Sequence, residues 1–393
     1  MSLLNIIKLP IRYKIWNPLH IQLILSDLIS PNQLAHNHKT HLTAAVDWLC
    51  RAQDVRNGKA DSGGVSAGWS FEDGWLPSYP ETSGYIVETF VAAASLLKRP
   101  ELITRASNIL EWERSIQNSD GSYPGHFGEA GSRPVIFNTG QIMHGMNCGY
   151  KELNKAECLE SAIQAGKWLI TQQDDDGCWR QSTHNDIPHT YNTRAAWALL
   201  QTGLLSNDKQ LVDAATRNID WALSQQLENG WFENNAFTTG SEPFTHTIAY
   251  AIRGILESGL LLGESRYIDA AEKAAQALAT AQRKDGAIAG TYDQDWNSRS
   301  YYVCLTGLAQ TSIIWSRLVN AHDKTELQPH IDMALHYLKQ KQHINNNNSV
   351  NDGAIAGSFP IWGRYSMFEY PNWAAKFFAD ALIEDKRTPS ESK

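Results

Sequence analysis

The sequence predicts a single all-α domain, an (α/α)6 toroid in which six helical hairpins surround a central funnel. One turn recurs along the 393 residues: a helix-like stretch ends in a glutamine, and a glycine follows. Four glutamines run directly into such a turn, as at 173–179, whereas two flanking copies are degraded. Consecutive glutamines lie 64, 56, 53, 56 and 60 residues apart, a regularity typical of repeat proteins. The six glutamines are Gln53, Gln117, Gln173, Gln226, Gln282 and Gln342.

Each repeat contains two kinds of helix. The stretch before a glutamine is amphipathic, as at 211–223, where apolar residues recur at helical spacing. The stretch after the turn, as at 193–205, carries almost no charge, which is typical of a helix buried between other helices. This alternation predicts an outer and an inner layer, with an open solenoid of helix pairs as the alternative. The inner helices are expected to begin near residues 82, 139, 193, 247, 301 and 373.

Composition limits the partners of the protein. Hydrophobic residues make up 42% of the chain, which is enough for one large core. A net charge of −8 without a concentrated basic run argues against nucleic acid as a partner. No apolar run reaches the roughly 20 residues that a transmembrane helix needs. Five scattered cysteines without a Cys-x-x-Cys pair indicate reduced thiols and no disulfide framework.

Three regions are expected along the chain: an N-terminal extension at 1–40, the toroid at 41–384 and a flexible tail at 385–393. The extension mixes Lys8, Arg12 and Lys14 with apolar residues and lacks a small-residue cleavage site. This pattern favours a cytoplasmic or membrane-peripheral location.

A functional site is expected at the mouth of the funnel, where the N-termini of the inner helices converge. Two of these helices carry polar groups one and two turns after their start, on one face of the helix. The first has Glu81, Tyr85 and Glu88, and the fourth has His246, Tyr250 and Arg253. Unpaired polar groups are costly in a core, so these faces should meet water or a ligand. A structural network between neighbouring hairpins is the alternative.

The loops that lead into the inner helices are rich in aromatic residues, such as Trp75, Tyr79 and Trp296. Aromatic rings stack on the flat faces of sugars, and they also stabilise carbocations. Two further rings beside the turn glycines, Trp179 and Trp231, are expected to be structural plugs between hairpins.

The motif Gln-x-x-x-Gly-x-Trp, which is most complete at 173–179, resembles the QW repeats of squalene–hopene cyclases and protein prenyltransferases. However, Asp174, Asp175 and Asp176 lie in the turn itself, a poor place for the proton donor that the cyclase resemblance implies. The segment 300–308 resembles a zinc-binding segment of the prenyltransferases, but Ser300 replaces the histidine ligand. The lanthionine cyclases, another zinc toroid, share only His144 and Gly145 of their motifs. No metal and no cofactor are therefore expected.

A second resemblance is to six-hairpin carbohydrate enzymes. The segments 173–181 and 190–199 resemble the turn and inner helix of unsaturated uronyl hydrolases, polysaccharide lyases and glucuronyl C5-epimerases. The segments 79–86 and 370–382 resemble uncharacterised proteins that accompany bacterial exopolysaccharide biosynthesis. These resemblances imply an enzyme that acts on a cell-surface polysaccharide or its lipid-linked precursor.

The interpretation that combines these observations is lyase or C5-epimerase chemistry on a uronate-containing glycan. The expected acids and bases are Glu81, Tyr85, His189, Tyr191, His246, Tyr250 and Tyr302. The expected substrate-binding residues are Trp75, Tyr79, Asn138, Asn192, Arg194, Arg253, Trp296, Arg364, Tyr365, Glu369 and Tyr370. Three alternatives are a glycoside hydrolase that pairs Glu81 with Glu369 or Glu88, a terpenoid cyclase or prenyltransferase, and a non-catalytic glycan-binding toroid.

Overall fold

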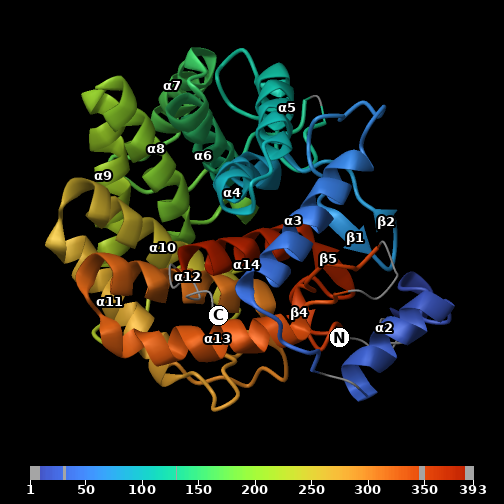
Figure 1. The fold of residues 1–393 in the computed structure, drawn as a ribbon. Helices are drawn as coiled ribbons and strands as arrows, with labels where there is room; N and C mark the ends of the chain where they lie inside the picture. The colour runs from blue at the N-terminus through green and yellow to red at the C-terminus, as the bar shows by residue number, and fades with distance from the viewer. Residues whose placement is uncertain (1–8, 30–31, 130, 345–349, 386–393) are drawn as a thin grey trace.

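The computed structural model describes residues 9–29, 32–129, 131–344 and 350–385, and its main body is a double ring of helices (Figure 1). Amphipathic and buried helices alternate along the chain, as the sequence predicts. The outer helices are α3 (His38–Asp54), α5 (Glu101–Ile116), α7 (Ala156–Thr171), α9 (Lys209–Ser224), α11 (Ser265–Thr280) and α13 (Gln328–Lys341). The inner helices are α4 (Pro80–Leu97), α6 (Ile136–Leu153), α8 (Thr193–Ser206), α10 (Thr245–Leu262), α12 (Leu305–His322) and α14 (Asn372–Glu384).

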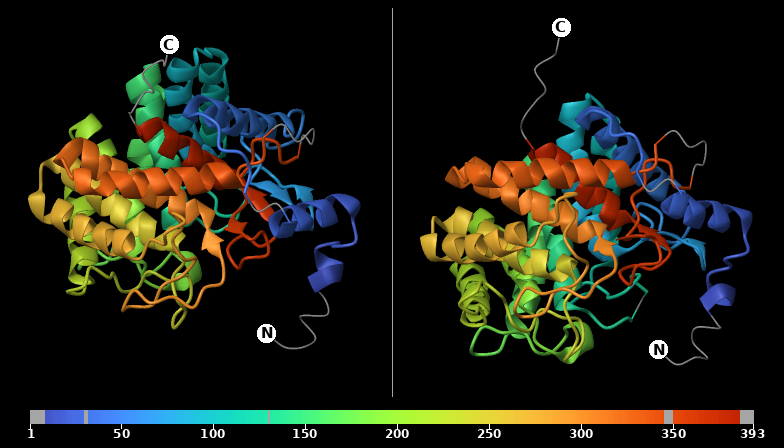
Figure 2. Two further views of the ribbon diagram at one scale, coloured as in Figure 1. Left: turned by 60° about the horizontal axis from the view of Figure 1, so that its bottom comes forward. Right: turned by 90° about the horizontal axis from the view of Figure 1, so that it is seen from below.

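The inner ring is closed. Each inner helix packs against the next one along the chain, and the last, α14, packs against both α3 and α4 of the first hairpin (Figure 1). The prediction of a toroid is therefore confirmed, and the open solenoid is excluded. The loops that lead into the inner helices gather at one side of the ring (Figure 2).

The fifth inner helix begins later than expected. Five inner helices start within three residues of their predicted positions, but α12 starts at Leu305 instead of near Tyr301. Residues Val303–Cys304 form a strand, β3, that pairs with β4 (Ser358–Phe359). Tyr301 is 62% exposed and lies outside both elements. The pairing partner is distant in sequence, so the local apolar pattern alone gave the wrong boundary.

A small antiparallel sheet joins the first and last hairpins at the mouth. Its strands β1 (Gly68–Ser70), β2 (Gly74–Trp75) and β5 (Glu369–Pro371) lie in the order β2-β1-β5. Trp69 faces Trp75 on one side and Tyr370 on the other. The loop before α4 and the loop before α14 are thereby fixed to each other.

The repeated glutamine joins each hairpin to the next. In every repeat its side-chain Nε2 donates one hydrogen bond to the carbonyl of the turn glycine and one to a carbonyl of the following outer helix, at 2.8–3.3 Å. The copies at Gln53 and Gln342, degraded in sequence, make the same pair of bonds through longer turns. Because Gln342 bonds the carbonyl of His41 in α3, the same contact also closes the ring.

The turn glycines cannot carry a side chain. Gly177, for example, has a φ of +88°, and a Cβ there would lie 2.4 Å from the carbonyl oxygen of Arg217 in the next outer helix. The neighbouring Trp179 is 1% exposed and donates its Nε1 hydrogen to the carbonyl of Leu169. Trp231 is buried as well. The prediction that these two rings are structural plugs is confirmed.

A helix near the start of the chain lies outside the ring. The helix α2 (Pro18–Ile29) projects at the edge of the molecule, with Leu23 buried against the body (Figure 1). The outer helix α3 begins at His38, just inside the expected extension at 1–40. The expected flexible tail lies outside the described residues, except for Asp385. Among the described residues, no helix combines the length and apolarity needed to cross a bilayer.

We predict that Gly177→Ala will lower the free energy of unfolding by about 2–4 kcal/mol, because it adds a clash to the cost of a left-handed backbone. Gly240 is the matched control: its φ is +77°, but a Cβ there would meet nothing within 4 Å. Gly240→Ala should cost only about 1 kcal/mol. Urea unfolding measures both values, and equal losses would contradict the role given to the turn.

Candidate functional site

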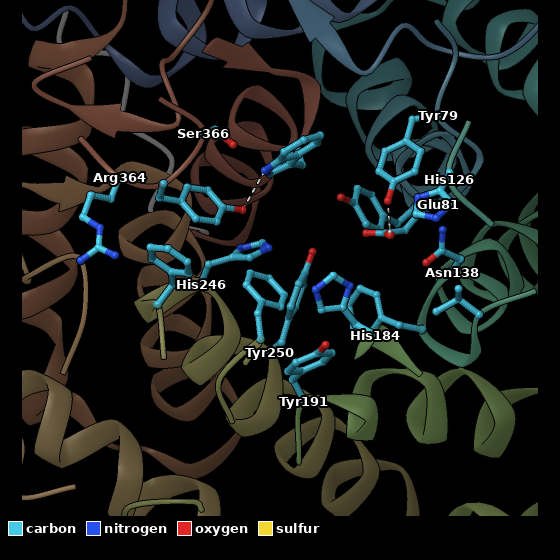
Figure 3. Close-up of a pocket in the computed structure, with 17 residues that line it drawn as sticks. Tyr79, Glu81, His126, Asn138, His184, Tyr191, His246, Tyr250, Arg364 and Ser366 are labelled. Atoms are coloured by element: carbon cyan, nitrogen blue, oxygen red, sulfur yellow. Dashed lines mark hydrogen bonds between the residues drawn. The ribbon is translucent and has the colours of Figure 1, made fainter. Parts of the chain in front are cut away.

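A cavity of about 350 Å³ opens at the mouth of the toroid (Figure 3). It is lined by residues of the inner helices and of the loops that lead into them. The sequence-predicted residues that line it are Tyr79, Glu81, Tyr85, Asn138, Tyr191, His246, Tyr250, Arg364 and Tyr365. The cavity lies at the mouth, where the sequence analysis placed the site, and it brings these nine predicted residues together.

Equivalent positions on opposite helices build the two main walls. Glu81 is the second residue of α4 and His246 the second residue of α10, so both stand at the start of their helices. Tyr85 and Tyr250 follow one turn later on the same faces. In Figure 3, Glu81 and the pair His246 and Tyr250 lie on different sides of the open centre. The helices α4 and α10 belong to the first and fourth of six hairpins, which are opposite in a closed ring.

The Glu81 side chain has a pKa near neutrality. Burial raises its pKa to about 7, although the hydrogen bond from Tyr79 and the positive charge of Arg194 both act in the opposite direction. The Tyr79 hydroxyl donates to Oε2 of Glu81 at 2.8 Å (Figure 3). The proline before it, Pro80, is the first residue of α4, where proline favours the start of a helix. A carboxyl with such a pKa can accept or donate a proton at physiological pH.

His246 is neutral, and Gln310 holds its ring through Nδ1. Burial, with a smaller contribution from the Arg194 cation, lowers its pKa to about 3. The side-chain amide nitrogen of Gln310 lies 2.6 Å from Nδ1. The His246 ring lies 4.2 Å from the ring of Tyr250 and 5.0 Å from that of Tyr365.

Tyr250 combines a buried hydroxyl with a neighbouring cation. Its hydroxyl lies beside the Tyr85 hydroxyl, an interaction that lowers the pKa of Tyr250 against the larger effect of burial. The guanidinium carbon of Arg194, from α8, lies 5.3 Å from the centre of the Tyr250 ring. Burial, followed by the Glu81 charge, raises the pKa of Tyr250, and the Arg194 cation opposes this rise. The phenol is thus a neutral proton donor whose anion Arg194 would stabilise.

Arg194 itself lies just behind the cavity wall. It is 2% exposed, stacks at 5.0 Å on Trp197 and donates from Nε to Gln141 at 3.3 Å. A second nitrogen of its guanidinium has no hydrogen-bond partner among the described residues. The position of Arg194 therefore favours an effect through its charge and not a direct contact with a ligand.

The rim of the cavity carries exposed charged and polar groups. Arg364 is exposed and forms no ion pair with another residue of the described part of the chain. His126 and His184, both exposed, stand on the loops before α6 and α8. These two histidines and the rings of Phe137, Phe237, Phe244 and Trp373 line the cavity although the sequence analysis assigned them no role. The sequence signal that could have identified them is their position between a glycine turn and an inner helix. Many residues that do not line the cavity share that position.

Arg253 and Tyr370 do not border the cavity, so this part of the expectation is wrong. Arg253 lies one turn deeper on α10 and pairs with Glu257 at 2.6 Å, four residues further along the helix. Tyr370 belongs to β5, where its hydroxyl lies 3.3 Å from Nε2 of His343. Local partners therefore hold both side chains away from the mouth.

Several other predicted residues also lie outside the cavity. His189 is buried, donates a hydrogen bond from Nε2 to the carbonyl of His184 at 2.7 Å, and stacks on Tyr191 with ring centres 4.4 Å apart. Tyr302 packs in a small cluster with Cys304 and Tyr365. These two side chains support lining residues from behind.

Four further predicted residues also lie away from the cavity. Trp75 packs against Trp48, and Trp296 donates its Nε1 hydrogen to the carbonyl of Asn229. Asn192 is buried just before α8, and Glu369 is part of β5. None of these four lines the cavity. Aromatic and amide side chains at these loop positions fill gaps between hairpins as readily as they bind ligands.

Sequence comparisons relate the chain to triterpene cyclases. A family model described as the squalene-hopene cyclase C-terminal domain matches residues 75–257, slightly less than half of the chain. The squalene–hopene cyclase of Zymomonas mobilis subsp. mobilis is 23% identical over 295 residues. The match covers 69% of this chain and 42% of that protein, so the chain spans less than half the length of this relative.

Solved structures of sugar enzymes share the fold over most of its length. Cellobiose 2-epimerase from Bacillus thermoamylovorans has a TM-score of 0.70 at 13% identity, covering 88% of this chain and 98% of that chain. Unsaturated glucuronyl hydrolase from Bacillus sp. GL1 has a TM-score of 0.68 at 14% identity, covering 89% and 97%. At such identities the likeness concerns the fold alone. The chain is an (α/α)6 toroid.

We predict that Glu81→Gln will stabilise the protein more at high pH than at low pH. The folded-state pKa of Glu81 is raised from 4.5 to about 7, so the folded protein binds its proton more tightly than the unfolded chain. Stability is therefore lost as the pH rises from the unfolded to the folded pKa. The gain from Glu81→Gln should be about 1–2 kcal/mol larger at pH 8 than at pH 5.

Urea unfolding at the two pH values measures this gain. The exposed Glu228 serves as the control, because Glu228→Gln should change stability by less than about 0.5 kcal/mol at either pH. A Glu81→Gln gain that is the same at pH 5 and pH 8 would show that the carboxyl is not held in the neutral form.

Proposed function

We propose that the protein is a carbohydrate-processing enzyme that moves a proton at a sugar carbon next to a carboxylate, as in epimerases and lyases of uronate-containing glycans. One observation carries the proposal: Glu81 and the pair His246 and Tyr250 line the same cavity from opposite helices. Moving a proton at a sugar carbon requires a base on one side of the carbon and a proton donor on the other. The cavity has a group that titrates near pH 7 on one wall and a neutral proton donor on the other.

The reaction can be written with these groups. The Glu81 carboxylate removes the proton from C5 of a uronate, and the electron pair of the broken C–H bond moves into the C6 carboxylate as an enediolate. In an epimerisation the Tyr250 phenol then gives its proton to C5 from the opposite face. Its phenolate is reprotonated from solvent, and the Glu81 carboxyl releases to solvent the proton that it took from C5. In an elimination the electron pair instead expels the C4 oxygen, which takes the Tyr250 proton. Opposite walls favour epimerisation, because the two faces of one carbon must be reached.

Positive charge at the site supports the same chemistry. An enediolate has one more negative charge on its oxygens than the substrate, and fixed positive groups stabilise it in a site that excludes water. Arg194 lies behind Tyr250, so it is placed to stabilise the phenolate after proton donation. Arg364, exposed at the rim, is available for a uronate carboxylate or for the next acidic sugar of the chain.

The aromatic lining fits a sugar ring. Tyr191, Phe237 and Phe244 form one side of the cavity, with ring centres 5.8 Å and 6.0 Å apart along the row. Stacking on C–H faces would orient the sugar, while Asn138 and Ser366 supply hydrogen bonds to hydroxyl groups. The natural substrate we propose is a bacterial cell-surface polysaccharide or its lipid-linked precursor, in keeping with the resemblance of 79–86 and 370–382 to exopolysaccharide-associated proteins.

The alternative reactions have weaker support from the geometry. Hydrolysis by two carboxylates requires a second carboxylate beside Glu81, but the described lining contains only one, since Glu88 and Glu369 do not reach the cavity. A terpenoid cyclase needs a strong acid in the funnel. The acidic turn residues Asp174 and Asp176 instead pair with Arg180 outside the cavity.

We predict that Tyr250→Phe and Glu81→Gln will each lower kcat by roughly 100-fold to 10,000-fold, the usual contribution of a positioned acid or base. The purified protein is incubated with uronate-containing oligosaccharides in deuterated water. Epimerisation places deuterium at C5, whereas elimination produces an unsaturated uronate that absorbs in the near ultraviolet. Binding of the oligosaccharide should persist in both variants.

Two matched controls separate catalysis from folding. Tyr123 is a fully buried tyrosine and Glu113 a fully buried glutamate, and neither lines the cavity. Tyr123→Phe and Glu113→Gln should leave kcat within about threefold of the wild type, because they touch no reacting atom. New reducing ends without deuterium or ultraviolet absorbance would indicate hydrolysis, and tight binding with no turnover would indicate a glycan-binding protein. Either result would overturn the proposal.

A further inference from the structure

The helix α2 is apolar on two faces, and only one of them is packed. His20 and Leu23 are buried against the body of the protein. The opposite face carries Ile21, Leu25, Leu28 and Ile29, which are 42%, 43%, 59% and 74% exposed. Their spacing of four, seven and eight residues places them on one side of the helix. We call these four side chains the α2 apolar face. Trp16, two residues before the helix, is 60% exposed.

The helix α2 and the segment before it contact, through other side chains, the loop that forms the last part of the cavity rim. The carboxylate of Asp27 in α2 accepts a hydrogen bond from the backbone N–H of Ile361 at 2.7 Å. Tyr13 packs against Phe368 with ring centres 4.8 Å apart. The loop between these two contacts contributes Arg364, Tyr365 and Ser366 to the cavity. A partner surface that binds the α2 apolar face would therefore lie close to the mouth of the toroid.

The charge of this region differs from that of the rest of the chain. Residues 1–29 contain three basic residues, Lys8, Arg12 and Lys14, and one acidic residue, Asp27, so this segment is net positive, whereas the whole chain has a net charge of −8. Arg12 pairs with Glu72 but its side chain is still 59% exposed. Two copies of the protein meeting through this region would bring like charges together. An anionic lipid surface, in contrast, is complementary to a basic and apolar segment that carries an exposed tryptophan.

We propose that the α2 apolar face docks the protein on the surface of an anionic lipid bilayer, with the mouth of the toroid beside the membrane. The helix has 12 residues, which at 1.5 Å per residue is about 18 Å, too short to cross a hydrocarbon core of about 30 Å. It lies in the interface, with Leu25, Leu28 and Ile29 inserted among the lipid chains. This inference concerns binding and does not depend on the reaction proposed above.

The test is sedimentation of the full-length protein with sucrose-loaded vesicles. Vesicles of equal parts phosphatidylglycerol and phosphatidylcholine should bind the protein, and Leu28→Asp should weaken this binding at least about 10-fold, because it places a charge in the apolar interface. Leu96 is the matched control: it is 56% exposed on α4, outside the α2 apolar face. Leu96→Asp should leave binding unchanged. Pure phosphatidylcholine vesicles should bind more weakly, and added salt should reduce the difference.

A second measurement reports insertion directly. Leu28→Cys labelled with an environment-sensitive fluorophore should show a blue shift on addition of anionic vesicles, and Leu96→Cys should not. The proposal fails if neither vesicle binds the protein or if the two aspartate variants weaken binding equally. It also fails if Leu28→Asp instead abolishes a dimer seen by analytical ultracentrifugation, because the face would then be an interface between two copies.

Discussion

The glutamine at the end of each outer helix provides the interaction on which the ring depends. Its side-chain amide satisfies the carbonyl of a glycine turn and a carbonyl of the next outer helix at the same time, so each hairpin is fixed to its neighbour by the same geometry. The glycine is needed because the next helix passes too close for a Cβ. Where Gln342 repeats this contact with α3, the ring closes, and the last inner helix is placed beside the first.

Closure has direct consequences for the site. With six hairpins in a ring, residues at the start of α4 and of α10 are held on opposite walls, and neither wall can move without disturbing its neighbours. Burial inside the ring raises the pKa of Glu81 to about 7 and lowers that of His246 to about 3. The same burial places the Tyr250 hydroxyl beside that of Tyr85 and raises the pKa of Tyr250. Groups held in this way reduce stability and are typical of functional sites.

The architecture could be predicted from the sequence because it rests on repeated local patterns. The glutamine spacing and the alternation of amphipathic and apolar stretches predicted the ring and most of the inner helix starts. The pairing of Glu81 and Tyr85 with His246 and Tyr250 followed from the same register. The sequence could not show that Val303 would pair with Phe359, which delays α12, because the partner is distant. Nor could it show that Glu257 draws Arg253 away from the mouth.

The most direct test of the account is a crystal structure of the Glu81→Gln variant with a uronate-containing oligosaccharide, because the variant should bind the substrate without turning it over. The account predicts one uronate ring inside the cavity, with its C5 between the side chain of residue 81 and the Tyr250 hydroxyl, each within about 3.5 Å. A glycan seated only on the outer rim, with residue 81 and Tyr250 touching no part of it, would contradict the account.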